Sequence, residues 1–360
     1  MTGEVRYGII GCGMMGQEHL RNLVALPGAR VAALADPHQP SIEQSLAQLD
    51  DPTAVEVHAD HRDLLASGAC DAVVVATPNM THAAVLLDVL ESPLPVLVEK
   101  PLCTTVADCQ RIVAAAHARE PIVWVGLEYR YMPPVARLVE LVRDGAVGPA
   151  RMVAIREHRF PFLPKVGDWN RFDRNTGGTL VEKCCHFFDL MNHIIGETPV
   201  RVLASGGQDV NHLEERYDGE RPDIIDNALV IVEYEGGARA SLDLCMFAEA
   251  SEHQEELAVV GDLGKAEAFL PSSEVRWGRR TDGRAGLHRE IAHDERVAHE
   301  GFHHGSSYLE HLDFLDAVRT GGRPAVDPED GLLSVAIGVA AQTSIHEQGS
   351  VLLADVLAAG

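Results

Sequence analysis

The chain has 360 residues, 46% of them hydrophobic, and a formal net charge of −24 at pH 7. This length fits two domains with sizeable cores better than one. Surfaces for nucleic acid or anionic lipid need clustered Lys and Arg, so the acidic balance excludes both kinds of partner. Apolar runs are too short to cross a bilayer, no leader follows Met1, and the seven cysteines are scattered and odd in number. We therefore expect a soluble, cytoplasmic protein with no membrane partner.

The first third of the chain alternates strand-like and helical segments. Short apolar runs predict strands at 5–10, 31–35, 72–76, 96–98 and 122–125. Helical spacing of apolar residues predicts helices at 14–26, 61–66, 80–91 and 105–118. Strands that alternate with helices predict an α/β domain with a doubly wound parallel sheet, which binds ligands at the carboxyl ends of its strands.

The loop after the first predicted strand carries a glycine motif. It reads Gly11-Cys12-Gly13-Met14-Met15-Gly16, which is G-x-G-x-x-G. The first glycine allows a tight turn, the second lets a pyrophosphate approach the backbone, and the third lets helix and strand pack closely. Free N–H groups and the helix dipole then stabilise the phosphates. Such a motif alone is often an ordinary turn, but between a strand and a helix it predicts dinucleotide binding.

Asp36 ends the second predicted strand and indicates which dinucleotide binds. A carboxylate there accepts hydrogen bonds from ribose hydroxyls and repels a 2′-phosphate. The following Pro37-His38-Gln39 supply no arginine for such a phosphate. NAD is therefore predicted rather than NADP. The alternative is that Asp36 only caps the following turn.

Further motifs follow in a recognisable order. They are Thr77-Pro78-Asn79 with His82, Glu99-Lys100-Pro101, Glu128-Tyr129-Arg130-Tyr131, and Gly177-Gly178-Thr179-Leu180 followed by Glu182 and His186. In this order and spacing, over nearly the whole chain and including 308–344, the sequence resembles the glucose–fructose oxidoreductase / inositol dehydrogenase / rhizopine-catabolism (Gfo/Idh/MocA) family. The E-K-P motif is its most specific element.

The resemblance implies a Rossmann domain followed by an α+β domain built on a large, mostly antiparallel open sheet. It also implies NAD(P)-dependent oxidation or reduction of sugars, inositols and related polyols. We assign residues 1–126 to the dinucleotide-binding domain and 127–360 to a substrate-binding and oligomerisation domain, forming a homodimer or homotetramer through an apolar sheet face. The expected cofactor contacts are the glycine loop and Asp36, joined by Thr77, Pro78, Asn79, His82, Glu99 and Lys100.

The second domain shows its own strand and helix signals. Strand-like runs lie at 226–234 and 238–247, joined by a hairpin turn at 235–237, with more at 256–260 and 265–270. Two helices are predicted near 305–319 and 329–346, and 273–303 is predicted as loop and short strand. Visible alternation predicts one buried sheet face.

The helix predicted after Gly177-Gly178 carries the most informative polar residues. Glu182, His186, Asp189 and His193 are spaced by four, three and four, so they share one stripe of an otherwise apolar helix. An all-round apolar helix is buried, so this stripe must face a polar cavity or be internally paired. A purely structural hydrogen-bond stripe is the alternative.

We expect His186 to be the general base, because histidine titrates near neutral pH. Glu182 would orient its ring, and Lys100 would hydrogen-bond the reacting oxygen. The bond before Pro101 is a candidate for the cis form, and a surface role is the alternative for Lys100. The family usually has aspartate at position 182 and a non-acidic residue at 183, which leaves Asp189 as a second candidate to orient His186.

Several other residues are expected to contact substrate, because polyols need many hydrogen-bond donors and often an aromatic face. They are Tyr129, Arg130, His158, Lys165, Trp169, Arg171 and Asp189. No metal is expected, because His303, His304 and His311 lack partners at ligand spacing. Adjacent Cys184 and Cys185 are interpreted as apolar filling.

The leading interpretation is an NAD-dependent sugar or inositol dehydrogenase. An alternative on the same frame is NAD-dependent glycoside cleavage, in which transient oxidation acidifies a neighbouring C–H. A non-catalytic nucleotide-binding sensor is a third possibility, because fold alone does not settle function. NADH accumulates with substrate only in the first.

Overall fold

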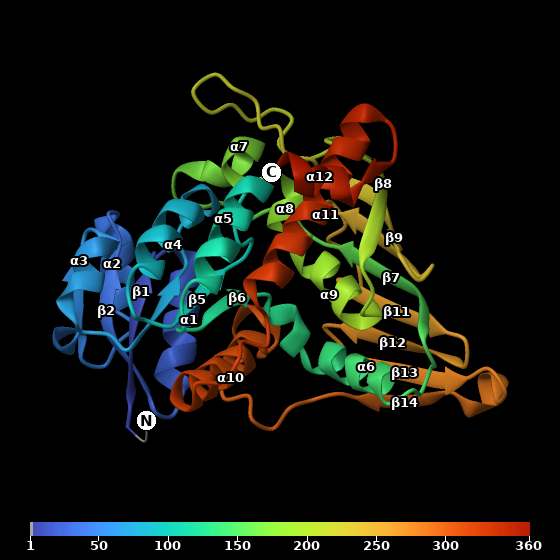
Figure 1. Ribbon diagram of the computed structural model, residues 1–360, viewed down its shortest axis with the longest axis horizontal. Coiled ribbons are helices and arrows are strands. Elements are labelled where there is room, and N and C mark those ends of the chain that lie inside the picture. Colours follow the sequence, from blue (N-terminus) through green and yellow to red (C-terminus); the bar gives the residue numbers. More distant parts are fainter. Residues whose placement is uncertain (1–2) are drawn as a thin grey trace. The chain divides into compact units, whose positions relative to one another are not determined.

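The computed structural model describes residues 3–360 and divides into two compact units (Figure 1). The first unit runs to Glu128 and also contains 165–169 and 295–335. The second contains 129–164, 170–294 and 336–360. The first break lies close to the boundary expected at 126/127, but a later segment returns to the first unit. It does so because helix α10 (Ser306–Thr320) packs against the first helix of the chain.

The first unit is built on a six-stranded parallel sheet in the order β3-β2-β1-β4-β5-β6. Its strands are β1 (Val5–Ile10), β2 (Ala29–Ala35), β3 (Glu56–His58), β4 (Ala72–Val75), β5 (Val96–Glu99) and β6 (Val123–Gly126). Its helices are α1 (Met14–Ala25), α2 (Gln39–Leu46), α3 (His61–Ser67), α4 (His82–Leu90), α5 (Val106–His117) and α10. The predicted doubly wound Rossmann sheet is confirmed. Short β3 and α2 were not predicted.

The centre of this sheet is buried on both faces. Every residue of β4 and β5 is buried, as parallel strands covered by helices require. Trp124 on β6 packs edge-on against Phe314 of α10, with ring centroids 5.9 Å apart. Its Nε1 donates to Oε1 of the buried Glu310, 3.1 Å away. The late segment 295–335 therefore completes the core of the first unit.

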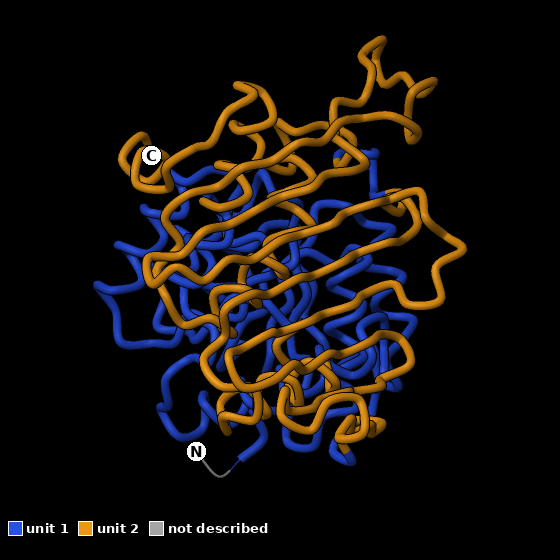
Figure 2. Tube along the Cα trace, turned by 90° about the vertical axis from the view of Figure 1, so that its right-hand side faces the viewer, with its two compact units in different colours: residues 1–128, 165–169, 295–335 blue, residues 129–164, 170–294, 336–360 orange. Residues whose placement is uncertain are grey.

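The second unit is built on a nine-stranded sheet in the order β14-β13-β12-β11-β7-β10-β9-β8-β15, and its strands lie side by side across Figure 2. Its strands are β7 (Ala150–His158), β8 (Pro199–Gly207), β9 (Asn227–Tyr234), β10 (Arg239–Cys245), β11 (Glu255–Gly261), β12 (Gly264–Leu270), β13 (Glu274–Arg279), β14 (His288–Ile291) and β15 (Val351–Leu352). Only β7 and β10 pair in parallel among these described strands. The predicted, mostly antiparallel sheet is confirmed.

Helices pack against this sheet. They are α6 (Pro133–Arg143), α9 (Cys185–Ile195) and α12 (Leu353–Ala359). The short helices α7 (Asp173–Thr176) and α8 (Thr179–Glu182) precede α9, and α11 (Pro328–Glu347) has residues in both units. Alternation along β7 buries Val153, Ile155 and Glu157 on the face that α9 covers. The opposite face is open and of mixed polarity: Met152 is 60% and Leu229 is 62% exposed, and Arg156 lies on the same face, paired with Glu256.

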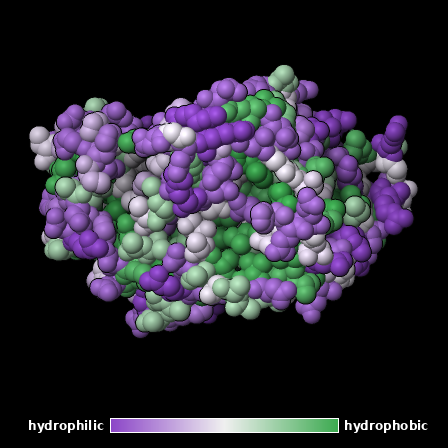
Figure 3. Space-filling model, turned by 90° about the horizontal axis from the view of Figure 1, so that it is seen from above, coloured by the Kyte–Doolittle hydropathy of each residue, from purple (hydrophilic) through white to green (hydrophobic). Residues whose placement is uncertain are grey.

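Hydrophilic residues cover most of the face drawn in Figure 3, with hydrophobic residues in patches. No helix within residues 3–360 has the length and apolarity needed to cross a membrane. Residues 1 and 2, at which the sequence was examined for a leader, lie outside the described residues.

The prediction of a single helix after Gly178 is wrong, because the structure has two helices there. Segment α8 ends at Glu182, and α9 begins at Cys185. The amide groups of Phe187 and Phe188 both donate to the carbonyl of Cys184, which starts a new helix at that point. The break falls at Lys183, a charged residue inside an apolar run. Glu182 and His186 therefore lie on different helices.

Two carboxylates face each other across the buried side of the sheet. Glu255 on β11 is the register partner of Glu157 on β7, and both are buried. Burial is the main cause that raises the pKa of Glu255 to about 7, and the negative charge of Glu157 is the second. Between about pH 4.5 and pH 7, Glu255 therefore keeps its proton in the folded protein but loses it in the unfolded chain.

This raised pKa predicts an alkaline loss of stability. Because the folded state binds the proton more tightly, Glu255 makes stability fall as pH rises from about 4.5 to above 7. Glu255→Gln, which stays neutral, should have a shallower decline of Tm between pH 5 and pH 8. Thermal unfolding followed by circular dichroism checks this, with the exposed Glu235→Gln as control. A variant whose decline matches the wild type would contradict the assignment.

Candidate functional site

The glycine loop after β1 has the geometry of a phosphate-binding turn. Gly11 has φ +94°, and a Cβ there would lie 2.6 Å from the backbone of Ala76. A Cβ on Gly16 would lie 1.9 Å from the carbonyl oxygen of Gly11, whereas Gly13 faces open space. Helix α1 then begins at Met14 with no acidic residue in its first turn. Open backbone beside a helix N-terminus fits a pyrophosphate.

Asp36 lies at the carboxyl end of β2 and ties the glycine loop to it. Its Oδ2 accepts from the amide of Cys12 at 2.6 Å, and its Oδ1 accepts from the amide of His38 at 2.7 Å. The turn-capping alternative is thus real, but the carboxylate is only half-buried and keeps lone pairs for ribose hydroxyls. His38 itself lies 2.9 Å from the hydroxyl of Ser41.

The loops after β4 and β5 are joined through His82. Its Nδ1 lies 2.8 Å from the carbonyl oxygen of Pro101, and its Nε2 lies 3.0 Å from that of Thr77. Burial lowers the pKa of His82. His82 is fully buried, so it shapes these loops instead of contacting a cofactor directly. The bond between Lys100 and Pro101 is cis, as considered above.

Behind Lys100, a buried polar network joins three elements of the first unit. The Oε2 of Glu99 accepts from the amide of Lys100 at 3.1 Å, and its Oε1 lies 2.9 Å from Nε2 of His19 on α1. The Nδ1 of His19 lies 2.8 Å from Nε2 of His311 on α10. A His19 ring protonated on both nitrogens donates to both neighbours.

The charges in this network are mutually stabilised. Burial by itself would raise the pKa of Glu99, but the hydrogen bond and charge of His19, with Lys100 and His303 nearby, lower that pKa to about 2. Burial, followed by the charge of His19, lowers the pKa of His311 well below its ordinary value. The contact between Glu99 and His19, beside a neutral His311, therefore fixes the start of the Lys100 loop.

In the second unit, His186 lies in the first turn of α9 and is buried. Its ring stacks face to face on Tyr129, with centroids 4.0 Å apart and planes 9° apart. The hydroxyl of Tyr129 accepts from Nζ of Lys183 at 2.6 Å. That Nζ also lies 3.1 Å from Oε1 of Glu157. Tyr129, predicted as a substrate contact, is thus held on its hydroxyl side by a buried ammonium.

The other members of the predicted polar stripe are paired inside the second unit. Asp189 accepts from Arg130 through both carboxylate oxygens, with Nε 2.7 Å from Oδ2. Nη2 of Arg143 lies 2.7 Å from Nε2 of His193, and burial with two nearby arginines lowers the pKa of His193 to about 3. Asp189 and Arg130 are therefore paired with each other, and their predicted roles at His186 and at the substrate stay predictions.

Glu182 ends α8 and is buried near a second carboxylate. Burial is the main cause that raises the pKa of Asp173 to about 7, and the negative charges of Asp223 and Glu182 add to it. The role of Glu182 in orienting His186 stays a prediction.

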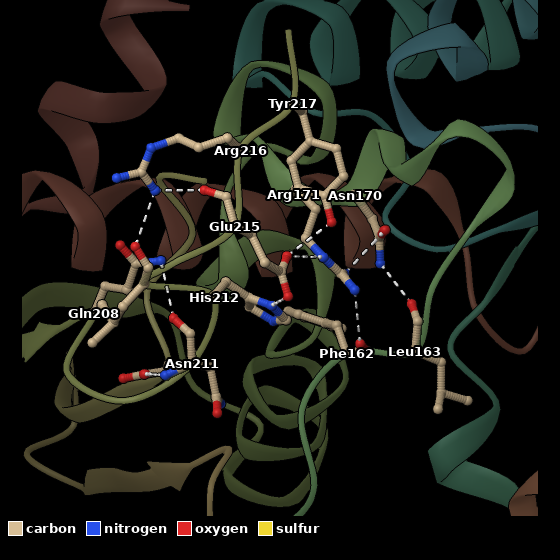
Figure 4. A network of polar contacts seen from close by, with 12 residues as sticks. Phe162, Leu163, Asn170, Arg171, Gln208, Asn211, His212, Glu215, Arg216 and Tyr217 are labelled. Carbon is tan, nitrogen blue, oxygen red and sulfur yellow. Dashed lines mark hydrogen bonds and ion pairs between the residues drawn. The ribbon is translucent and has the colours of Figure 1, made fainter. Parts of the chain in front are cut away.

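Two more residues predicted to contact substrate lie elsewhere. His158 points to the sheet face opposite Glu157, because adjacent strand residues alternate, and its Nε2 lies 3.2 Å from Oδ1 of Asp243 on that face. Buried Arg171 instead holds local backbone: it donates to the carbonyl of Phe162 and pairs with Glu215 at 3.3 Å (Figure 4). The sequence could not show which face or which network either side chain joins.

The network around Arg171 ties two loops of the second unit together. Figure 4 shows Glu215 accepting from Tyr217 as well as contacting Arg171, and His212 lies 2.8 Å from its other oxygen. Asn170 donates to the carbonyl of Leu163. Within the second unit, the network therefore fixes residues 162–163 and 170–171 against the loop at 212–217. Lys165 and Trp169 belong to the first unit, and their substrate roles stay predictions.

Sequence reasoning missed three residues of these networks: His19, Glu157 and Lys183. Each is a buried polar or charged residue beside apolar neighbours. A charge in a buried run requires a partner, which was the available signal, but the partner's position was not readable. His303 lies 3.3 Å from Glu128, and within residues 3–360 no group of three or more His, Cys, Asp or Glu side chains is arranged to hold a metal.

Comparison with known proteins matches both halves of the chain to one oxidoreductase family. The model of its NAD-binding Rossmann fold matches residues 5–127, and that of its C-terminal alpha/beta domain matches 139–353. The myo-inositol 2-dehydrogenase of Thermotoga maritima is 27% identical over 355 residues, which is 98% of this chain and 100% of that protein. Inositol 2-dehydrogenase 2 of Saccharopolyspora erythraea is 30% identical over 291 residues, covering 80% and 79%.

Solved structures share the fold along the whole chain. The oxidoreductase domain protein from Kribbella flavida superposes with a TM-score of 0.86 at 22% identity, covering 98% of this chain and 100% of that one. A levoglucosan dehydrogenase in complex with NADH gives a TM-score of 0.84 at 19% identity, covering 97% and 99%.

The glycine loop predicts contrasting effects of two alanine substitutions. Gly13→Ala meets no protein atom within 4 Å, so it should keep the wild-type Tm yet weaken NADH binding by roughly tenfold or more, because its methyl lies where the pyrophosphate approaches. Gly16→Ala clashes with the backbone and should lower both Tm and affinity. NADH fluorescence titration and thermal unfolding measure the two effects. Unchanged NADH affinity in Gly13→Ala would contradict the site.

The Glu99 network predicts an acid-sensitive contribution to stability. Because folding lowers the pKa of Glu99 from 4.5 to about 2, its contribution is complete above about pH 5 and is lost as pH falls toward 2. Glu99→Gln should lower Tm at pH 7 and flatten the fall of Tm between pH 5 and pH 3. Exposed Glu4→Gln is the control. The same acid slope in Glu99→Gln and wild type would refute the pairing.

Proposed function

The chain belongs to the Gfo/Idh/MocA oxidoreductase family and binds NAD, and on this basis we propose that it oxidises a secondary alcohol of a sugar, inositol or related polyol. The observation that carries the proposal is that the glycine loop and Lys100 lie at the same end of the first sheet. The glycine loop follows β1 and Lys100 follows β5, so both lie at the carboxyl ends of parallel strands in one sheet.

The residues present fit a dinucleotide. The open backbone at Gly13 and the N-terminus of α1 would hold the pyrophosphate, and Asp36 would accept from the ribose. When bound, NAD accepts the hydride that leaves the carbinol carbon. All remaining tasks belong to side chains of this chain.

His186 is proposed to take the hydroxyl proton of the substrate. A buried imidazole held in a fixed plane suits a general base, because its ordinary pKa lies near neutrality. Glu182 is proposed to orient its ring, since Asp189 is already paired with Arg130.

Lys100 is proposed to donate a hydrogen bond to the reacting oxygen and stabilise its developing negative charge. Support comes from the way its loop is held. The amide of Lys100 donates to Glu99, and the carbonyl of Pro101 lies against His82. A lysine on so firmly anchored a loop suits a positioning task better than a surface role.

The substrate class is supported by the relatives. Inositol 2-dehydrogenases match most of the chain, and a levoglucosan dehydrogenase shares its fold. We propose in addition that a second copy of the chain covers the open face of the second sheet, where Met152 and Leu229 are exposed, forming a homodimer or homotetramer.

Replacing the two proposed catalytic groups tests the reaction. His186→Asn and Lys100→Met should each lower the rate of NAD reduction by roughly 100-fold or more. NADH affinity should stay near wild type in His186→Asn, because the proposed role of His186 does not involve dinucleotide binding. A screen of inositols, aldoses and glycosides, with NADP in parallel, identifies the substrate. Exposed Lys265→Met is the matched control for the lost charge.

Retained turnover in His186→Asn would remove the base assignment. Cleavage of a glycoside without net NADH formation would favour transient oxidation over the dehydrogenase. Absence of turnover with every polyol, despite tight NAD binding, would favour a nucleotide-binding sensor.

A further inference from the structure

Lys183 is a buried cation that the proposed chemistry does not use. It lies at the break between α8 and α9 and is only 4% exposed. An ammonium removed from water must be paired and hydrogen-bonded. Lys183 meets this requirement through Glu157, which is fully buried, and the hydroxyl of Tyr129. Both partners of the Lys183 ammonium therefore lie inside the protein.

Around Lys183, the sheet provides an anionic anchor. Glu157 and Glu255 face each other on β7 and β11, and Nη1 of Arg159 lies 3.4 Å from Oε1 of Glu157. Because strands fix the backbone of these acids, the position of Glu157 is set by the sheet. The ammonium that bonds to it is consequently fixed as well.

Tyr129 contacts both Lys183 and His186 of α9. The Nζ of Lys183 lies 2.6 Å from the hydroxyl oxygen of Tyr129 but 4.8 Å from its ring centroid, so it sits beyond the hydroxyl end of the ring. The face of the same ring is stacked on His186 at 4.0 Å. Glu157, Lys183, Tyr129 and His186 thus form one continuous series of contacts within the second unit.

The plane of an imidazole decides where its basic nitrogen points. The lone pair of a neutral ring nitrogen lies in the ring plane, while the χ2 torsion of histidine is broad and weakly restrained. A base must hold its nitrogen within hydrogen-bond reach of the proton that it removes. Stacking on a fixed aromatic ring restrains this torsion.

We propose that Tyr129 and Lys183 are positioning residues that fix the ring plane of His186, with Glu157 as the anchor of Lys183. This inference rests on the proposed function of His186 as the base. Tyr129 acts here through His186, and its contact with substrate stays a prediction.

Graded variants separate the ring from its anchor. In the NAD-bound enzyme, Tyr129→Leu removes the stacking ring and should lower kcat by roughly 30-fold, with the KM for NAD within about twofold of wild type. Tyr129→Phe keeps the ring and should recover most of that loss. Lys183→Met should resemble Tyr129→Phe, and the double variant should be no slower than either alone, because both break one bond.

A second design guards against loss of folding. Lys183→Met leaves the buried Glu157 with only the longer, 3.4 Å contact to Arg159, whereas the pair Lys183→Met with Glu157→Gln removes both charges. The pair should regain thermal stability over Lys183→Met yet keep the lowered kcat. Exposed Lys265→Met should match wild type in both respects.

A readout independent of turnover completes the test. In enzyme carrying ¹³C-labelled histidine, the His186 signal, assigned with His186→Asn, should be shifted upfield by the Tyr129 ring current and should lose that shift in Tyr129→Leu. Wild-type turnover in His186→Asn would mark failure of the proposed function alone. Wild-type ring shift and kcat in Tyr129→Leu, or additive losses in the double variant, would overturn the positioning proposal.

Discussion

A buried carboxylate must find its hydrogen bonds inside the protein. The first unit depends on how Glu99, at the carboxyl end of β5, does so. One oxygen is bonded to the loop that presents Lys100, and the other lies against His19 on the helix that begins at the phosphate-binding turn. His311 extends the contact to α10. A single ion pair thus fixes the spacing between a dinucleotide-binding element and the lysine proposed to act beside it.

The second unit meets the same constraint with the opposite charge. Lys183 is placed where α8 breaks from α9, and its partners come from β7 and from the segment before α6. Loss of the Lys183–Glu157 pair would leave the buried Glu157 with only the longer contact to Arg159. Both units therefore use one buried ion pair to hold a loop or ring that the proposed reaction needs, which leaves the reacting side chains little conformational freedom.

Local sequence predicted the features that depend on local physics. Parallel strands buried on both faces appear as short apolar runs, and the glycines of the loop at 11–16 are required by backbone geometry alone. The break at Lys183 was missed because apolar spacing continues across it. The placement of His158 and Arg171 was missed because it depends on strand pairing and loop contacts between residues far apart in sequence. Candidate residues could be named, but their partners could not.

The first unit is discontinuous, and this has a consequence for how the protein is made. Trp124 and its partner Glu310 are 186 residues apart, and His19 and His311 are 292 apart. A nascent chain leaving the ribosome therefore carries the whole dinucleotide-binding sheet long before α10 is synthesised. Until that helix arrives, Tyr7 and Trp124 lack the aromatic neighbour that covers them, and a chain truncated after the Rossmann segment would expose this surface to aggregation.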